Sequence, residues 1–282
     1  MSQATIYYFT GTGNSLAVAR ALAARIGASL VPVTSTIGQA SVETDTNVVG
    51  FVFPIYDFKV PKIMEELVEK LTSIDSKHLF AVCTYGIAAG QSLKRFGKTV
   101  EEHGGRLCGG FAVAMPHNGV GCRFVSRSNR TRLLEASLGR TETIAGYIER
   151  RLDGTIESSR VFPALVRPWM LRTIPTLARF VGRLVIKGEK SLALTASEEC
   201  NGCGICAELC PVENIEMVGE HARWLDRCLG CFACLHWCPR RAISLGGQDM
   251  GIDHYHHPDV SLSDMIQGER DYDIRENVRV AA

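Results

Sequence analysis

One cysteine pattern occurs twice near the C-terminal end of this chain of 282 residues. In each copy a second and a third cysteine follow at intervals of two residues, a fourth follows after three more, and proline comes next. The first copy is Cys200, Cys203, Cys206 and Cys210, and the second is Cys228, Cys231, Cys234 and Cys238. Three thiolates from a tight loop and a fourth from elsewhere are the ligand set of a four-iron, four-sulfur cube. The pattern therefore predicts a small fold that is held together by metal clusters.

We predict two 4Fe-4S clusters with crossed ligation, because in two-cluster ferredoxins the fourth cysteine of each run binds the other cluster. The expected ligands of cluster one are Cys200, Cys203, Cys206 and Cys238, and those of cluster two are Cys228, Cys231, Cys234 and Cys210. Crossed ligation is consistent with two short helices packed back to back in a pseudo-symmetric domain. Each cube passes one electron, so the chain is expected to handle single electrons.

Zinc is the main alternative, because paired Cys-x2-Cys elements often bind it tetrahedrally. Zinc sites normally use two cysteines per element, and zinc explains neither the third cysteine nor the repeated Cys-Pro. A disulfide framework is disfavoured, because the chain opens with MSQATIYYFTGTG and shows no export signal there. We expect a reducing, cytoplasmic location and an anaerobic setting. The remaining cysteines, Cys83, Cys108 and Cys122, lack ligand spacing and are predicted to be packing residues.

The composition is that of a globular protein, with 46% apolar and 22% charged residues. A formal charge of +1 argues against nucleic acid as a partner. The cysteine region is too small to bury a large core, whereas the first half of the chain can form a full domain. We predict a first domain over 1–152, a basic and apolar helical linker over 153–192, a cluster domain over 193–247 and an acidic tail over 248–282.

A hydroxyl-rich and glycine-rich loop lies between a predicted strand, Thr5–Phe9, and a predicted helix, Leu16–Ile26. Such a loop offers N–H groups and hydroxyls at the positive end of a helix, where a phosphate is well accommodated. It is not a dinucleotide fingerprint, because Leu16 replaces the third glycine, and it is not a Walker A motif. We predict a monophosphate site, with a simple helix cap as the alternative. Its residues are Thr10, Gly11, Thr12, Gly13, Asn14 and Ser15.

Further apolar segments predict a parallel sheet covered on both faces. The predicted strands are Val48–Phe53, His78–Cys83 and Leu107–Met115, together with Thr5–Phe9 and a strand around Val31. Helical spacing follows two of them, over Lys62–Leu71 and up to about His103. The fold class is α/β, a flavodoxin-like doubly wound sheet of five parallel strands in the order 2-1-3-4-5, followed by a small α+β cluster domain. Ligands of such sheets bind at the carboxyl ends of the strands, where the unusual loops lie.

The loop Thr10–Ser15, and Thr84–Gly86 with Gly90, resemble those of short-chain flavodoxins. Joined to the double cysteine run, the chain resembles the flavodoxin-ferredoxin fusion family of anaerobic bacteria and archaea. Further similarities are Phe53–Tyr56 with Pro61, Met115–Asn118 and Tyr255–Asp259. The resemblance implies one FMN and two 4Fe-4S clusters on one polypeptide, which serves as an electron carrier or a reductase component.

The resemblance places the FMN phosphate on Thr10–Ser15 and the isoalloxazine ring between two later loops. One departure is Ile87, which stands where flavodoxins commonly have an aromatic residue. Stacking would then fall to Tyr56 or Tyr85, and the outer face of the ring would stay open to a partner. Alternatively, Tyr56 and Phe58 only cover the sheet edge. Asp57 would disfavour a negatively charged flavin unless it is solvated. The expected ring contacts are Pro54, Ile55, Tyr56, Asp57, Phe58, Thr84, Tyr85, Gly86, Gly90 and Asn118.

Residues 160–187 are apolar with interspersed arginines, but no apolar run there is long enough to span a bilayer. An amphipathic helix over this segment is expected to pack across the two domains it joins, and contact with a membrane surface is the less favoured reading. A basic stretch after the last predicted strand would dock an acidic partner or an anionic substrate, or would be solvated. Its members are Arg123, Arg127, Arg130 and Arg132.

The first functional hypothesis is an electron-transfer protein that relays single electrons between the clusters and FMN and feeds a separate partner protein. The second is an FMN-dependent reductase that acts on a small molecule, with the clusters as its electron supply. Tyr56, Tyr85 and His117 would then line a substrate pocket. No dinucleotide-binding motif is present in the sequence, so direct oxidation of NAD(P)H is not expected.

Overall fold

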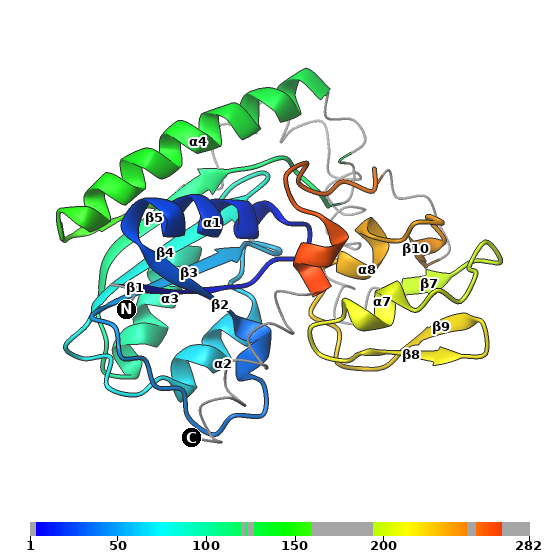
Figure 1. Ribbon diagram of the computed structural model, residues 1–282, viewed down its shortest axis with the longest axis horizontal. Coiled ribbons are helices and arrows are strands. Elements are labelled where there is room, and N and C mark those ends of the chain that lie inside the picture. Colours follow the sequence, from blue (N-terminus) through cyan, green and yellow to red (C-terminus); the bar gives the residue numbers. More distant parts are fainter. Residues whose placement is uncertain (1–3, 120–121, 123–126, 159–193, 247–251, 267–282) are drawn as a thin grey trace, which may run out of the picture.

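The computed structural model describes residues 4–119, 122, 127–158, 194–246 and 252–266. Its main element is a parallel sheet of six strands in the order β2-β1-β3-β4-β5-β6 (Figure 1). The first five strands have the predicted order, which is that of the flavodoxin-like fold. The strands are β1 (Ala4–Tyr8), β2 (Ala28–Pro32), β3 (Val48–Pro54), β4 (His78–Tyr85), β5 (Leu107–Ala114) and β6 (Thr155–Ile156).

Helices cover both faces of the sheet, which is why its central strands are apolar throughout. α1 and α4 pack together on one face, and α2 and α3 lie on the other (Figure 1). The Phe96 ring of α3 meets the rings of Phe51 and Phe53 in β3, with centroids 5.3 and 4.9 Å apart. The helices are α1 (Asn14–Ile26), α2 (Lys62–Lys70), α3 (Ser92–Glu102) and α4 (Arg127–Glu149), with a short 3-10 helix η1 (Val33–Thr36) after β2.

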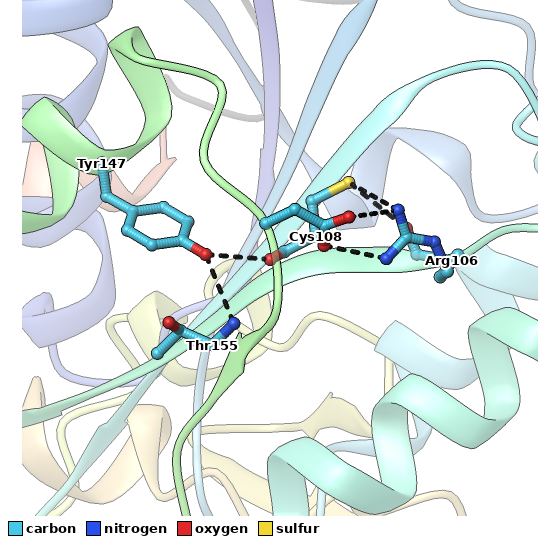
Figure 2. A network of polar contacts seen from close by, with 5 residues as sticks. Arg106, Cys108, Tyr147 and Thr155 are labelled. Carbon is cyan, nitrogen blue, oxygen red and sulfur yellow. Dashed lines mark hydrogen bonds and ion pairs between the residues drawn. The ribbon is translucent and has the colours of Figure 1, made fainter.

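The sixth strand corrects the prediction of five. β6 has only two residues and no apolar run; it pairs with β5 through backbone hydrogen bonds, and side chains add to this pairing. The Tyr147 hydroxyl of α4 donates to the carbonyl of Cys108 at 3.4 Å and accepts from the Thr155 amide at 3.3 Å (Figure 2). The Glu157 carboxylate accepts from the amide of Ala112 at 2.8 Å. The sheet thus continues past the domain boundary that we predict at residue 152.

The cysteine-rich part forms a small α+β unit with two antiparallel strand pairs. Two four-residue helices pack against each other, in agreement with the predicted pair of short helices. The unit lies at the carboxyl ends of the parallel strands (Figure 1). Its elements are β7 (Leu194–Ala196), paired with β10 (Ile243–Leu245), β8 (Ile215–Val218), paired with β9 (His221–Trp224), and the helices α7 (Ile205–Glu208) and α8 (Ala233–His236).

The two parts share one buried apolar cluster. Cys231, Ala233 and Trp237 belong to the same cluster as the core of the sheet. We call Ile252–Ile266 the closing segment; it runs between the two parts (Figure 1). The predicted linker helix over 160–187, Arg123 and residues 267–282 of the acidic tail lie outside the described residues. Over the described ranges, no helix is long and apolar enough to cross a membrane.

Candidate functional site

The first cysteine quartet lines one cavity, which we call the cluster-one cavity. Met217, Ala222 and Ile243 complete its apolar wall. Cys203 is exposed and Cys206 is buried. The cysteines that line this cavity are Cys200, Cys203, Cys206 and Cys238. The structure therefore brings together the four residues that the sequence assigns to cluster one.

The second quartet lines another cavity, which we call the cluster-two cavity. Here two of the cysteines are buried, and Trp224 and Ile215 lie on the wall. The cysteines are Cys210, Cys228, Cys231 and Cys234. In the described part of the chain, no three His, Cys, Asp or Glu side chains are placed to hold a single metal ion. The quartets instead enclose a space, which is what a cube with a cysteine at each iron requires.

Backbone amides point at equivalent sulfurs in the two sites. The amide of Asn214 donates to Cys210 Sγ at 3.1 Å, and that of Ala242 donates to Cys238 Sγ at 3.4 Å. Hydrogen bonds of this kind tune the potential of a cluster. In the metal-free chain, burial raises the pKa of Cys206 to about 11 and that of Cys231 to about 12, and neighbouring cysteine charges add to the effect. Cluster assembly must therefore release protons from these thiols.

The hydroxyl-rich loop lies at the carboxyl ends of β1 and β3, where the strand order reverses. We call the space beside it the loop hollow. Gly13 has a φ of 87°, a conformation that favours glycine, and α1 begins directly after it. The predicted residues that line the loop hollow are Thr10, Gly11, Thr12, Asn14, Ser15, Pro54, Ile55, Tyr56, Thr84, Tyr85, Gly86 and Asn118.

Polar side chains around the loop hollow bond to one another. The hydroxyls of Ser15 and Thr84 are 2.8 Å apart, and Asn118 Nδ2 donates to Thr12 Oγ1 at 2.6 Å. Thr10 Oγ1 accepts from the amide of Gly13 at 3.0 Å. Thr10 and Gly13 thus share one bond within the loop, while Thr12 and Ser15 are tied to the strand ends.

A wider space adjoins the loop hollow, and we call it the wide hollow. Asp57 and Phe58 lie on its wall with left-handed φ values of 48° and 60°. Asp57 is exposed, so its carboxylate is solvated and has little influence on the charge of a ligand. Gly90 is buried and lines neither hollow. The residues shared by both hollows are Ile55, Tyr56, Tyr85, Gly86 and Asn118.

The cluster-binding loop supplies part of the wall of the wide hollow. Leu229 and Phe232 line both the wide hollow and the cluster-two cavity, and Gly230 lies between them. Gly11 touches the same loop, because a Cβ built on it would lie 2.5 Å from the carbonyl oxygen of Cys231. Only glycine fits at this contact.

The residues around the two hollows offer hydrogen-bond donors to a ligand that carries a phosphate. The hydroxyl of Tyr56 is buried at their junction and has no hydrogen-bond partner among the described residues. Burial raises the pKa of Tyr56, and the charge of Cys231 adds to the effect, so the phenol is a donor. The start of α1 adds N–H groups without intrahelical acceptors. This donor set suits FMN, which binds at this switch point in flavodoxin-like sheets.

Several residues of the site could not be found by motif reasoning. Leu229 and Phe232 lie within the second cysteine run, and the spacing of that run does not indicate that they also contact the wide hollow. His117, by contrast, is a residue that the second functional hypothesis places in a substrate pocket, and it does lie on the wall of the wide hollow. The Arg130 guanidinium, predicted to meet an acidic partner or solvent, pairs instead with Asp253 of the closing segment at 2.7 Å.

Residues 193–243 match a family of 4Fe-4S dicluster domains. Flavodoxin from Megasphaera elsdenii is 19% identical, with 48% of this chain and 98% of that chain covered and a TM-score of 0.33. Azoreductase from Bacillus anthracis is 12% identical, with 51% of this chain and 99% of that chain covered and a TM-score of 0.36. Rubredoxin oxygen:oxidoreductase from Desulfovibrio gigas is 14% identical, with 52% of this chain and 36% of that chain covered and a TM-score of 0.35. No curated protein matches this chain.

These structural similarities are weak, and the strand order of the sheet itself identifies its fold. The family match identifies the cysteine-rich part as an iron-sulfur domain. The chain thus joins a flavodoxin-like domain to a 4Fe-4S dicluster domain, which is the composition of the flavodoxin-ferredoxin fusion family that its sequence resembles.

Proposed function

We propose that this protein relays single electrons between two 4Fe-4S clusters and FMN. The observation that carries the proposal is the wall shared by Leu229 and Phe232, which separates the cluster-two cavity from the wide hollow. A cluster and a flavin ring on its two sides would be separated only by these side chains. When bound, each cluster supplies one-electron chemistry, and the flavin accepts either one or two electrons.

Different residues of the chain would bind the phosphate, the flavin ring and the clusters. Thr10–Ser15 and the start of α1 would bind the phosphate, because helix N-termini favour anions. Tyr56 and Tyr85 would flank the ring on the wall of the wide hollow. The crossed cysteine quartets would hold one cluster each. The pKa of the Tyr56 phenol, raised by burial, keeps its proton in place as a donor.

Electrons would pass between the cofactors in a definite order. The cluster-two cavity shares Leu229 and Phe232 with the wide hollow, whereas the cluster-one cavity is lined only by residues of the ferredoxin-like part. One cysteine of each quartet is exposed, Cys203 and Cys228, so exposure does not distinguish the two sites. Because only cluster two would have the flavin beside it, cluster one would exchange electrons with a separate redox protein, and cluster two would connect it to the flavin.

A reductase acting on a small molecule is the second candidate, and the open wide hollow favours it. Ile87 on its wall is 63% exposed and Phe58 is 40% exposed, so the hollow has an apolar rim that reaches solvent. Addition of a substrate to the reduced protein would reoxidise its flavin without a partner protein. A pure carrier would be reoxidised only by a redox protein or a comparable electron acceptor.

Cofactor analysis tests the proposal first. Protein purified without oxygen should contain about eight irons and one FMN per chain, as two cubes and one flavin require. A content dominated by zinc, or a chain that takes up no flavin, would contradict the proposal. Stepwise reduction should then show that clusters and flavin exchange electrons until they reach one common equilibrium.

A further inference from the structure

A loop that binds phosphate must present donors to the anion and keep its own acceptors occupied elsewhere. Two carbonyls of the loop are occupied by groups from the second half of the chain. The carbonyl of Gly11 accepts from Trp237 Nε1 at 3.1 Å, and that of Thr12 accepts from the amide of His257 at 2.8 Å. Both donors come from sequence beyond the flavodoxin-like sheet, which therefore does not hold this loop by itself.

The amide oxygen of Asn14 at the end of the loop is also occupied by a group from the second half of the chain. Asn14 Nδ2 donates to the carbonyl of Pro116 at 3.3 Å, and a carbonyl can only accept. Asn14 Oδ1 must then face the other way, where the Tyr255 hydroxyl donates to it at 2.8 Å. Burial raises the pKa of Tyr255, so its hydroxyl keeps its proton. The Tyr255 ring lies 5.7 Å from the guanidinium of Arg130, which fixes it from the outer side.

The closing segment that carries Tyr255 is attached to α1 at a second point. Asp264 pairs with Arg20 at 2.6 Å. Val260 packs over Gly13, where an added Cβ would lie 2.9 Å from Val260 Cβ. The segment therefore covers the outer side of the loop.

We propose that Tyr255 is a positioning residue of the phosphate site. By holding Asn14 Oδ1 on the outer side, it keeps the loop in the conformation that receives a phosphate, and it so favours FMN over the unphosphorylated flavin. The inference rests on the proposed function, because it assumes that the ligand of the loop hollow is a flavin phosphate.

The test compares FMN with riboflavin, which differ only in the phosphate. Flavin-free chain with intact clusters is titrated under anaerobic conditions, and quenching of flavin fluorescence gives the two Kd values. We expect Tyr255→Phe to weaken FMN binding about tenfold, the size of one net hydrogen bond, and to leave riboflavin binding unchanged. Tyr147→Phe is the matched control, because it also removes a bonded hydroxyl but lies at the β5–β6 edge (Figure 2). It should change neither Kd.

A double-mutant cycle asks whether Tyr255 acts through Asn14. In an Asn14→Ala background, Tyr255→Phe should have no further effect on FMN binding. Equal losses for both flavins, no loss for FMN, or fully additive effects would overturn the inference. If the unaltered chain binds neither flavin, the proposed function itself fails, and that result is distinct from the others.

Discussion

The two cysteine quartets have the same sequence spacing but different surroundings. In the quartet of cluster two, Cys231 packs into the core shared with the sheet, and Leu229, two residues before it, lines the wide hollow. In the quartet of cluster one, the corresponding Cys203 is exposed. Equal ligand sets can therefore have unequal roles, because their position relative to the flavodoxin-like domain decides which cluster is next to the flavin.

The largest expected effect comes from breaking one quartet at a time. Cys228→Ala should remove cluster two and abolish electron transfer from the clusters to FMN, because cluster one has no wall in common with the wide hollow. Cys200→Ala, at the equivalent first position, should leave transfer between cluster two and FMN intact. Anaerobic stopped-flow absorbance of flavin and clusters measures both. Equal losses in the two variants would contradict the assigned order.

Removal of iron should destabilise the cysteine-rich part of the molecule much more than the sheet. A chelator should unfold 194–246, because this small unit depends on its clusters, while the sheet keeps its own apolar core. Hydrogen exchange should become fast in β7 to β10 and stay slow in β1, β3 and β4. Retained protection in the cysteine-rich part would show that it folds without iron.

A substitution at the contact between the parts should have a moderate effect. Gly11→Ala places a methyl group 2.5 Å from the carbonyl oxygen of Cys231 and 2.8 Å from the hydroxyl oxygen of Tyr56. We expect a loss of about 1–3 kcal/mol in the free energy of unfolding, as for other overpacked sites. Thermal unfolding measures this loss of stability, and FMN titration measures the effect of the substitution on the site.

Gly146→Ala in α4 is the matched control for that substitution, because no atom outside the neighbouring helix backbone lies within 4 Å of the added Cβ. It should stabilise the protein by about 0.5–1 kcal/mol, since alanine favours a helix interior over glycine. A destabilised Gly146→Ala, or an unaffected Gly11→Ala, would remove the argument from close contact.

The smallest effect is expected where the closing segment meets α1 at the surface. Asp264→Asn removes the ion pair with Arg20, whose side chains are 30% and 41% exposed. Surface pairs contribute about 0–1 kcal/mol, so unfolding and FMN binding should change little. A loss of FMN affinity as large as that of Tyr255→Phe would mean that attachment of the whole segment, and not the Asn14 bond, governs the site.

The sequence predicts what depends on local spacing. Apolar runs predict β1 to β5 and their order, and the cysteine intervals predict two quartets that the structure does bring around two cavities. The sequence does not predict β6, because a strand of two residues beside Tyr147 has no periodic pattern. It does not predict that Leu229 lines the wide hollow either, because this contact depends on how the two parts pack together, and no local pattern encodes that packing.

The dependence of the electron-transfer rate on protein concentration tests the central claim most directly. The clusters of the flavin-loaded chain are reduced rapidly without oxygen, and the appearance of electrons on the flavin is followed at several protein concentrations. If cluster two and FMN lie on the two sides of Leu229 and Phe232, the rate is the same at every concentration. A rate that rises in proportion to protein concentration would mean that electrons pass between molecules, and it would contradict the proposed relay.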